Sequence, residues 1–155
     1  MNPSLFQALA AALAATKIEQ KLALTATLAD NWNAGLLNID IPPNPQLACG
    51  RPEKPELVAP GAVQQRNPKT PEGRARLLHA IVHIEFSAIN LALDHAARFP
   101  GMPRQYYADW IGVAVEEAYH FTLLRERLQA LGHDYGDFPA HAGLWEMAEK
   151  TSGDV

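Results

Sequence analysis

The placement of proline divides this 155-residue chain into three parts. Eight of the twelve prolines lie between Pro42 and Pro71. Proline lacks a backbone N–H and clashes with the preceding helical turn, so neither a helix nor a central strand fits this stretch. We therefore expect an N-terminal helix and turn over residues 1–40, an extended proline-rich strap over 41–71, and a helix pair with a C-terminal loop and short helix over 72–155.

Helix-forming residues dominate both sides of the strap. Alanine and leucine are abundant over residues 4–29, where we predict one continuous helix with Ser4 as its N-cap. Thr70 and Pro71 predict the start of a second helix, and Gly132 predicts the end of a third. No stretch alternates with a period of two, so the predicted fold class is all-α. The predicted helices cover residues 4–29, 71–98, 103–131 and 143–150.

Composition narrows the class of protein. The formal net charge is -4, which makes binding of nucleic acid by charge alone unexpected. A single cysteine, Cys49, excludes a disulfide framework and fits a reducing compartment. The early apolar stretch, Leu5 to Ala15, is too short to cross a bilayer and follows no basic segment. We therefore expect no membrane anchor, no secretory signal and a cytoplasmic location.

The helix predicted over residues 71–98 has two different faces. One apolar stripe, with three- and four-residue spacing, carries a single charge, Glu85. Its members are Leu78, Ile81, Val82, Glu85, Ala88, Ile89, Ala92 and Ala96. The opposite stripe is polar, and we expect it to face solvent. It consists of His79, His83, Ser87, Asn90 and Asp94.

The next helix repeats this pattern. Its apolar stripe is interrupted by two ionisable residues, Glu117 and His120, which lie three residues and about one turn apart. The neighbouring Glu116 is expected to be more exposed. The stripe consists of Tyr106, Trp110, Val113, Glu117, His120, Phe121, Leu124, Leu128 and Leu131.

These positions predict a metal site at a helix–helix seam. A carboxylate in an apolar seam is unfavourable without compensation, and neither stripe holds a lysine or arginine. One Glu plus one Glu-x-x-His is half of the ligand set that helical bundles use for a di-iron or di-manganese centre. Two simpler interpretations stay open. Glu85 could form an ion pair or hydrogen bond at the seam, and a Glu-x-x-His sequence is common by chance.

Other candidate residues favour structural roles. His79 and His83 are four residues apart, but their polar stripe favours surface or capping histidines. Glu19 in the first helix is a possible further carboxylate. The remaining aromatic and histidine candidates are interpreted as packing or loop residues: Trp32, Trp110, Trp145, Tyr106, Tyr119, His95, His133 and His141.

Four segments, in order, resemble an uncharacterised bacterial ferritin-like family that is filed as a domain of unknown function. They are residues 51–58, 79–94, 116–121 and 131–145. The resemblance implies a ferritin-like helical bundle with a two-metal carboxylate site. It implies that Glu85 is the first-helix ligand, Glu117 the bridging ligand and His120 the histidine ligand.

Members of that family continue with two further helices, which carry another Glu and another Glu-x-x-His. We therefore expect this chain to supply part of the bundle, completed by a second copy in a homo-oligomer or by the missing C-terminal half. The expected function is that of a non-haem di-metal protein, with iron as the cofactor and manganese as an alternative. An oxygen-activating oxidoreductase of unknown substrate is the enzyme that this site suggests.

Two other functions stay open. The first is a metal-free helical interaction or assembly module, in which Glu85 and Glu117 have only hydrogen-bond partners. The second is an oxygenase that modifies nucleic acid, which needs a basic surface. The local candidates for that surface are Arg74, Arg76, Arg98, Arg104, Arg125 and Arg127.

Overall fold

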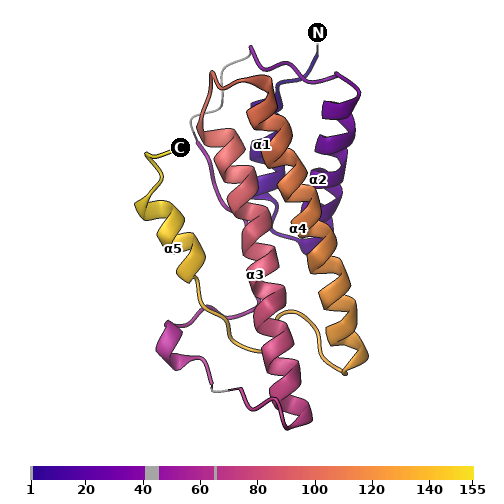
Figure 1. The fold of residues 1–155 in the computed structure, drawn as a ribbon, viewed down its shortest axis with the longest axis vertical. Coiled ribbons are helices and arrows are strands. Elements are labelled where there is room, and N and C mark those ends of the chain that lie inside the picture. Colours follow the sequence, from indigo (N-terminus) through magenta and orange to yellow (C-terminus); the bar gives the residue numbers. More distant parts are fainter. Residues whose placement is uncertain (1, 41–45, 65) are drawn as a thin grey trace.

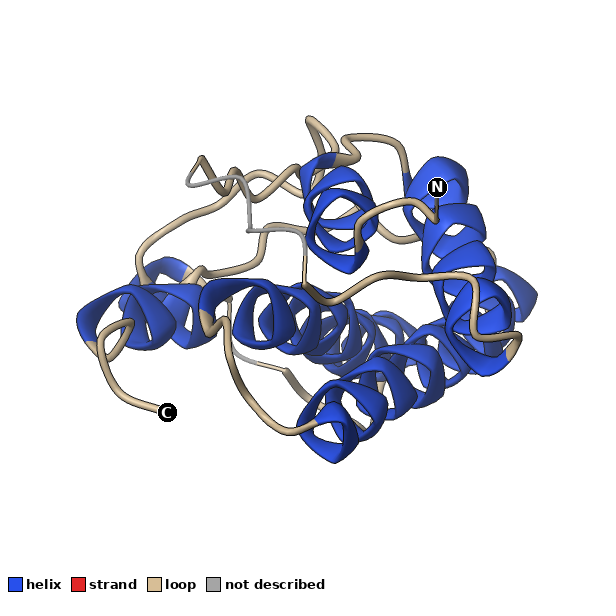
Figure 2. Ribbon diagram, turned by 90° about the horizontal axis from the view of Figure 1, so that it is seen from above, coloured by secondary structure: helices blue, strands red, loops and turns tan. Residues whose placement is uncertain are grey.

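The computed structural model describes residues 2–40, 46–64 and 66–155, and its regular elements are helices (Figure 1). Viewed from above, these residues form helices and loops without strands (Figure 2). Only two isolated β-bridges occur among them, Ser4 with Asn38 and Leu57 with Ala140. The all-α prediction is thus confirmed. The elements are α1 (Leu5–Ala14), α2 (Ile18–Asn33), the 3-10 turn η1 (Pro60–Ala62), α3 (Pro71–Arg98), α4 (Arg104–Ala130) and α5 (Gly143–Lys150).

The prediction of a single N-terminal helix is wrong. The chain is extended at Ala15 and Lys17, so α1 and α2 form a hairpin instead. Lys21 of α2 is completely buried, and its ammonium donates to the carbonyls of Ala12 and Leu13 at 3.0 and 2.6 Å. A cation at a helix C-terminus is favourable, because the last carbonyls there lack intrahelical partners. Helix propensity alone cannot predict this break, since the break arises from packing between α1 and α2.

The predicted N-cap hydrogen bond of Ser4 is also absent. Ser4 directly precedes α1, but its hydroxyl is buried and makes no hydrogen bond with the described residues. The Leu5 N–H donates instead to the carbonyl of Asn38, at 3.0 Å. The start of α1 is therefore capped by a segment that follows α2 in the chain.

The ends of the two long helices agree with the sequence prediction to within one residue. The Thr70 hydroxyl accepts a hydrogen bond from the Gly73 N–H at 3.0 Å, as expected of an N-cap. Gly132 has a φ of +85°, a left-handed conformation that glycine adopts readily and that ends α4.

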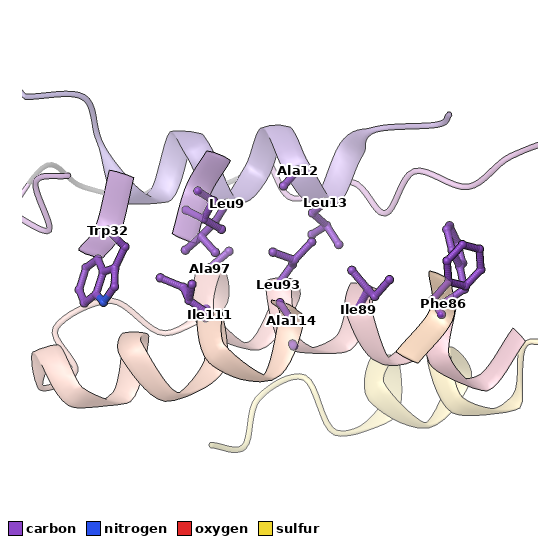
Figure 3. Close-up of a cluster of buried hydrophobic side chains, with 14 of the residues drawn as sticks. Leu9, Ala12, Leu13, Trp32, Phe86, Ile89, Leu93, Ala97, Ile111 and Ala114 are labelled. Carbon is purple, nitrogen blue, oxygen red and sulfur yellow. The ribbon is translucent and has the colours of Figure 1, made fainter. Parts of the chain in front are cut away.

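The long helices α3 and α4 pack against each other and form the centre of the fold. Helix α1 lies on α3, α2 lies on α4, and α5 contacts α3 from another side. Apolar side chains from α1 to α4 meet between these layers (Figure 3). A fully buried aliphatic or aromatic side chain contributes roughly 1.5–3 kcal/mol to stability, so this layer anchors the fold. It includes Leu9, Leu13, Trp32, Ile89, Leu93, Ala97, Ile111 and Ala114.

The polar stripe of α3 was expected to face solvent, and this expectation is wrong. His79 is 1% exposed, and His83, Asn90 and Asp94 are buried too. The loop after α4 covers this stripe near His79 and His83, so α3 is packed here as well as against α1 and α4. The Gly136 N–H donates to His79 Nε2 at 3.0 Å.

His83 is held at both ring nitrogens. Its Nδ1 lies 2.8 Å from the Tyr135 hydroxyl, and its Nε2 lies 2.8 Å from the carbonyl of His141. A carbonyl can only accept, so Nε2 carries the proton and the neutral ring accepts from Tyr135 at Nδ1. The polar stripe thus binds the C-terminal loop through hydrogen bonds, which helical spacing alone could not predict.

The described part of the strap is without helix or strand except for the 3-10 turn, which the sequence did not predict, and a further turn at Pro68 and Lys69 closes it before α3. Residues 41–45 and 65 of the predicted strap lie outside the described residues. The strap follows the end of α1 closely, because the Gly50 N–H donates to the Leu13 carbonyl at 2.9 Å. A Cβ at Gly50 would lie 2.0 Å from the Ala14 carbonyl oxygen, so only glycine fits there. Further along, Val58 and Glu56 form backbone hydrogen bonds with Ala140.

Helix α3 is long and apolar enough, by length and composition, to cross a bilayer, alone among the described helices. Half of its most apolar 18-residue window is buried inside the protein. Core helices of globular proteins pass the same test, so the finding is weak evidence for a membrane. The cytoplasmic location stays a prediction.

The first testable prediction concerns Lys21. Lys21→Ala should lower the free energy of unfolding by about 2–4 kcal/mol, because it leaves a cavity and removes the donor to the Ala12 carbonyl. Chemical denaturation measures this change. The control Lys17→Ala removes an exposed lysine from the same segment and should change stability by less than about 0.5 kcal/mol. Equal effects of both variants would contradict the role given to Lys21.

The second prediction concerns His79. Burial lowers the pKa of this ring to about 4, from an ordinary value of 6.5. The unfolded chain therefore binds a proton between these values that the folded protein does not, and stability falls as the pH drops through this window. The loss from His79 should reach about 2–3 kcal/mol. Stability measured from pH 7 to pH 4 should fall less steeply in His79→Gln, whose amide oxygen can still accept from Gly136.

Candidate metal centre

The packing of α3 against α4 brings Glu85, Glu117 and His120 together. Each offers one ligand atom, and these atoms all lie within 4.8 Å of one another. His120 Nδ1 is 3.2 Å from Glu117 Oε2 and 4.0 Å from Glu85 Oε2. No other group of three or more His, Cys, Asp or Glu residues in the described parts of the chain has metal-ligand spacing. The structure thus joins the three residues that the sequence singled out.

The distances fit a shared metal ion. Imidazole nitrogen and carboxylate oxygen atoms bind divalent transition-metal ions at about 2.0–2.2 Å. Two ligand atoms of one ion therefore lie at most about 4.2 Å apart. The two distances from His120 Nδ1 satisfy this limit. The most distant pair of ligand atoms lies within 4.8 Å, slightly beyond this limit. The donor set, two carboxylates and one imidazole, suits iron or manganese.

The electrostatics of the cluster favour one retained proton on the carboxyl pair. Burial, a hydrogen bond with Glu117 and the charge of Glu117 together raise the pKa of Glu85 to about 7. The same hydrogen bond, with help from His120, lowers the pKa of Glu117. The two carboxyl groups therefore share a proton near neutral pH. Among the described residues, no lysine or arginine forms an ion pair with either carboxylate.

The cluster is less buried than the sequence implied. The side chains of Glu85, Glu117 and His120 are 19%, 24% and 49% exposed. Large apolar side chains of the same two helices, those of Ile81 and Leu123, are also exposed. Helices α1 and α2 cover the opposite side of the α3–α4 pair, and no described element covers this one. The cluster therefore opens onto an uncovered apolar surface.

The structure separates the other candidates from the cluster. His79 and His83 lie on the other side of α3, and Glu19 forms an ion pair with Arg125 at 3.1 Å. Glu116 is exposed, as predicted. The Tyr106 hydroxyl donates to the carbonyl of His95, which is a structural role.

Three of the six arginines that could form a basic surface are paired with acids. Arg76 binds Glu72, Arg98 binds Asp94, and Arg125 binds Asp134. This pairing reduces the positive surface that binding to nucleic acid requires.

Sequence reasoning missed the direct contact between the two carboxyl groups. Helical spacing places Glu117 and His120 on one face, because both belong to the same helix. The register between α3 and α4 is set by side chains that are distant in the sequence. Helical spacing therefore could not predict the contact of Glu85 with Glu117. The residues gave one signal, a carboxylate without a cation on each stripe, and the family resemblance gave another, since it implied that both carboxylates belong to one site.

Comparison with known proteins gives a family but no described activity. Residues 14–155 match the model of a family described as "Protein of unknown function (DUF455)". A curated relative from Haemophilus influenzae, described as "Uncharacterized protein", is 43% identical over 162 residues. The match covers 97% of this chain and 56% of the relative, so the chain spans about half the relative's length. No solved structure matches this chain.

The third prediction tests the shared proton in metal-free protein. The folded state holds a proton on Glu85 between pH 4.5 and about 7, so Glu85 costs stability as the pH rises through this window. Glu85→Gln should therefore be more stable than the parent by about 1 kcal/mol near pH 8 and equal to it near pH 5. Denaturation at both pH values, with a chelator present, measures the difference. The exposed neighbour provides the control, Glu116→Gln, which should show no such dependence.

Proposed function

This chain belongs to the family described as Protein of unknown function (DUF455), and we propose that it is a ferritin-like, non-haem di-metal carboxylate protein. Iron is the proposed metal, and manganese is the alternative. The observation that carries the proposal is the convergence of Glu85, Glu117 and His120 at one seam, without a nearby cation.

The donor chemistry supports a metal more than a simple hydrogen-bonded cluster. Two carboxylates that share a proton lose it when a divalent cation binds, because metal ligands must be deprotonated. The cation would then supply the positive charge that neither helix provides. We expect affinity to increase as the pH rises through about 7, the pKa of Glu85 in the absence of metal.

Each residue has a proposed role. Glu85, Glu117 and His120 would hold the metal, with Glu117 as the ligand shared between the two ions and Glu85 and His120 as terminal ligands. Iron bound in this way would supply electrons for the activation of dioxygen or peroxide, which is the chemistry of an oxidoreductase. A partner that covers this exposed surface would limit the access of water to the metal.

The proposed centre needs ligands beyond these three. A complete bundle site of this type uses two Glu and two Glu-x-x-His sequences, and the described cluster holds one of each. A second copy, related by a two-fold axis, would supply an identical set. The rest of a longer chain could supply it as well, and the matched relative is longer than this chain. Either partner would also cover the exposed apolar residues around the cluster.

A second candidate function is a metal-free assembly module. The exposed side chains of Ile84 and Leu123 favour it, because uncovered apolar surface of this kind marks interaction sites. In this case Glu85 and Glu117 need only share their proton. The two candidates differ in their response to loss of a carboxylate.

The fourth prediction separates them. After anaerobic loading with ferrous iron and desalting, the protein should hold about one iron per chain, since two copies would share two ions. Glu117→Ala and His120→Ala should each reduce the iron content to background. Glu116→Ala changes a neighbouring exposed carboxylate and should leave it unchanged. Inductively coupled plasma mass spectrometry measures the content.

The stability of the same variants completes the test. Removal of a metal ligand should lower the melting temperature of iron-loaded protein, because bound metal stabilises the folded state. If Glu117→Ala raises the melting temperature and leaves the iron content unchanged, the di-metal function is wrong. The assembly module would then be the better account.

A further inference from the structure

We propose that a cavity on the side of α3 facing away from the metal cluster binds a small amphipathic anion, with an apolar body and an oxyanion head. The cavity has a volume of about 950 Å³. Residues of three segments line it, namely residues 61–64 and Arg66 of the strap, part of α3 between Arg76 and Ser87, and part of the segment after α4 between Phe138 and Leu144. His83 and Ser87 line it and lie two residues on either side of Glu85, so they project from the other side of the helix. The site is independent of the proposed metal centre.

The walls of the cavity are suited to an apolar body. Ile84 and Leu144 line it and are 50% and 42% exposed, although both are large and aliphatic. Val63 and Phe138 add apolar surface from the strap and the C-terminal loop. A volume of this size is typical of sites for small organic ligands, which are mostly apolar with a few polar groups. A ligand there would cover the exposed aliphatic side chains.

The charged groups of the lining specify the head of the ligand. Arg66 and Arg76 line the cavity, and no aspartate or glutamate does so among the described residues. A guanidinium presents paired N–H donors that match the geometry of a carboxylate or phosphate. Two arginines without an acid on the same wall therefore favour an anion and disfavour a cation.

Both guanidinium groups have donors available. Arg66 has no hydrogen-bond or ion-pair partner within the described parts of the chain. Arg76 donates from Nε and Nη2 to Glu72, which is highly exposed, and its Nη1 has no acceptor among the described residues. An exposed pair one helical turn apart is weak, so Glu72 competes little with a ligand. Arg76 also packs over the ring of Phe138, 4.5 Å from its centroid, which orients the guanidinium.

The test uses this 155-residue chain without added metal and three probes that each carry a ten-carbon chain. They are sodium decanoate, decyl phosphate and decyltrimethylammonium, each below its micelle-forming concentration, with binding measured by isothermal titration calorimetry. At least one of the two anions should bind saturably with one site per chain, and the cation should bind at least tenfold more weakly. The anion that binds more tightly shows whether the head group of the ligand is a carboxylate or a phosphate. Either result supports the proposal.

Variants locate the binding. The double change Arg66→Gln with Arg76→Gln should weaken binding of the anion at least tenfold. The control variant, Lys17→Gln with Arg127→Gln, also removes two positive charges, from exposed positions outside the cavity lining. It should leave the affinity for the anion unchanged. Ala80→Trp should abolish binding of the anion by filling the cavity, while thermal unfolding confirms that the variant is folded.

Three outcomes would overturn the proposal. The first is equal affinity for the anions and the cation, and the second is unchanged affinity in the double arginine variant. The third is absence of saturable binding up to about 1 mM, the weak limit for a specific site. Glu117→Ala, which disrupts the proposed metal centre, should bind the anion as the parent does. Failure of either proposal is thereby distinguishable from failure of the other.

Discussion

The packing of α3 against α4 is the interaction on which the rest of this structure depends. These two helices are the longest in the chain, and α1, α2 and α5 all pack against one or both of them. Their register places Glu85 against Glu117 and His120. The same pairing positions the loop after α4 so that it returns along the far side of α3. A single helix–helix contact thus fixes both the candidate metal centre and the walls of the large cavity.

Three ionisable groups within this core are accommodated in three different ways. Lys21 stays fully buried because the carbonyls at the end of α1 accept its hydrogen bonds. His79 stays neutral, since its Nε2 accepts from a backbone N–H and burial lowers its pKa. Glu85 shares a proton with Glu117. The first two groups are satisfied by backbone partners, whereas the carboxylate pair depends on a shared proton and on the contact of Glu117 with His120.

The two sides of α3 therefore differ in the charge of the partner that they lack. On the side of Glu85, two carboxylates and an imidazole are partly exposed and have no cationic partner among the described residues. On the other side, His79 and His83 have their hydrogen bonds, and the nearby arginines lack an anionic partner within the cavity. The first side of α3 is thus the proposed site of a cation, and the second is the proposed site of an anion. The covering loop, itself bonded to the histidines, makes the second surface concave.

The sequence by itself determined the features that depend on neighbours along the chain. The ends of α3 and α4 follow from Thr70 and Gly132, and the Glu-x-x-His spacing follows from one helical turn. Only the tertiary structure decided the break between α1 and α2, the burial of the polar stripe of α3 and the partial exposure of the carboxylates. Each of these depends on which segment covers which face. That choice is made by contacts between residues distant in the chain, which propensity and periodicity do not encode.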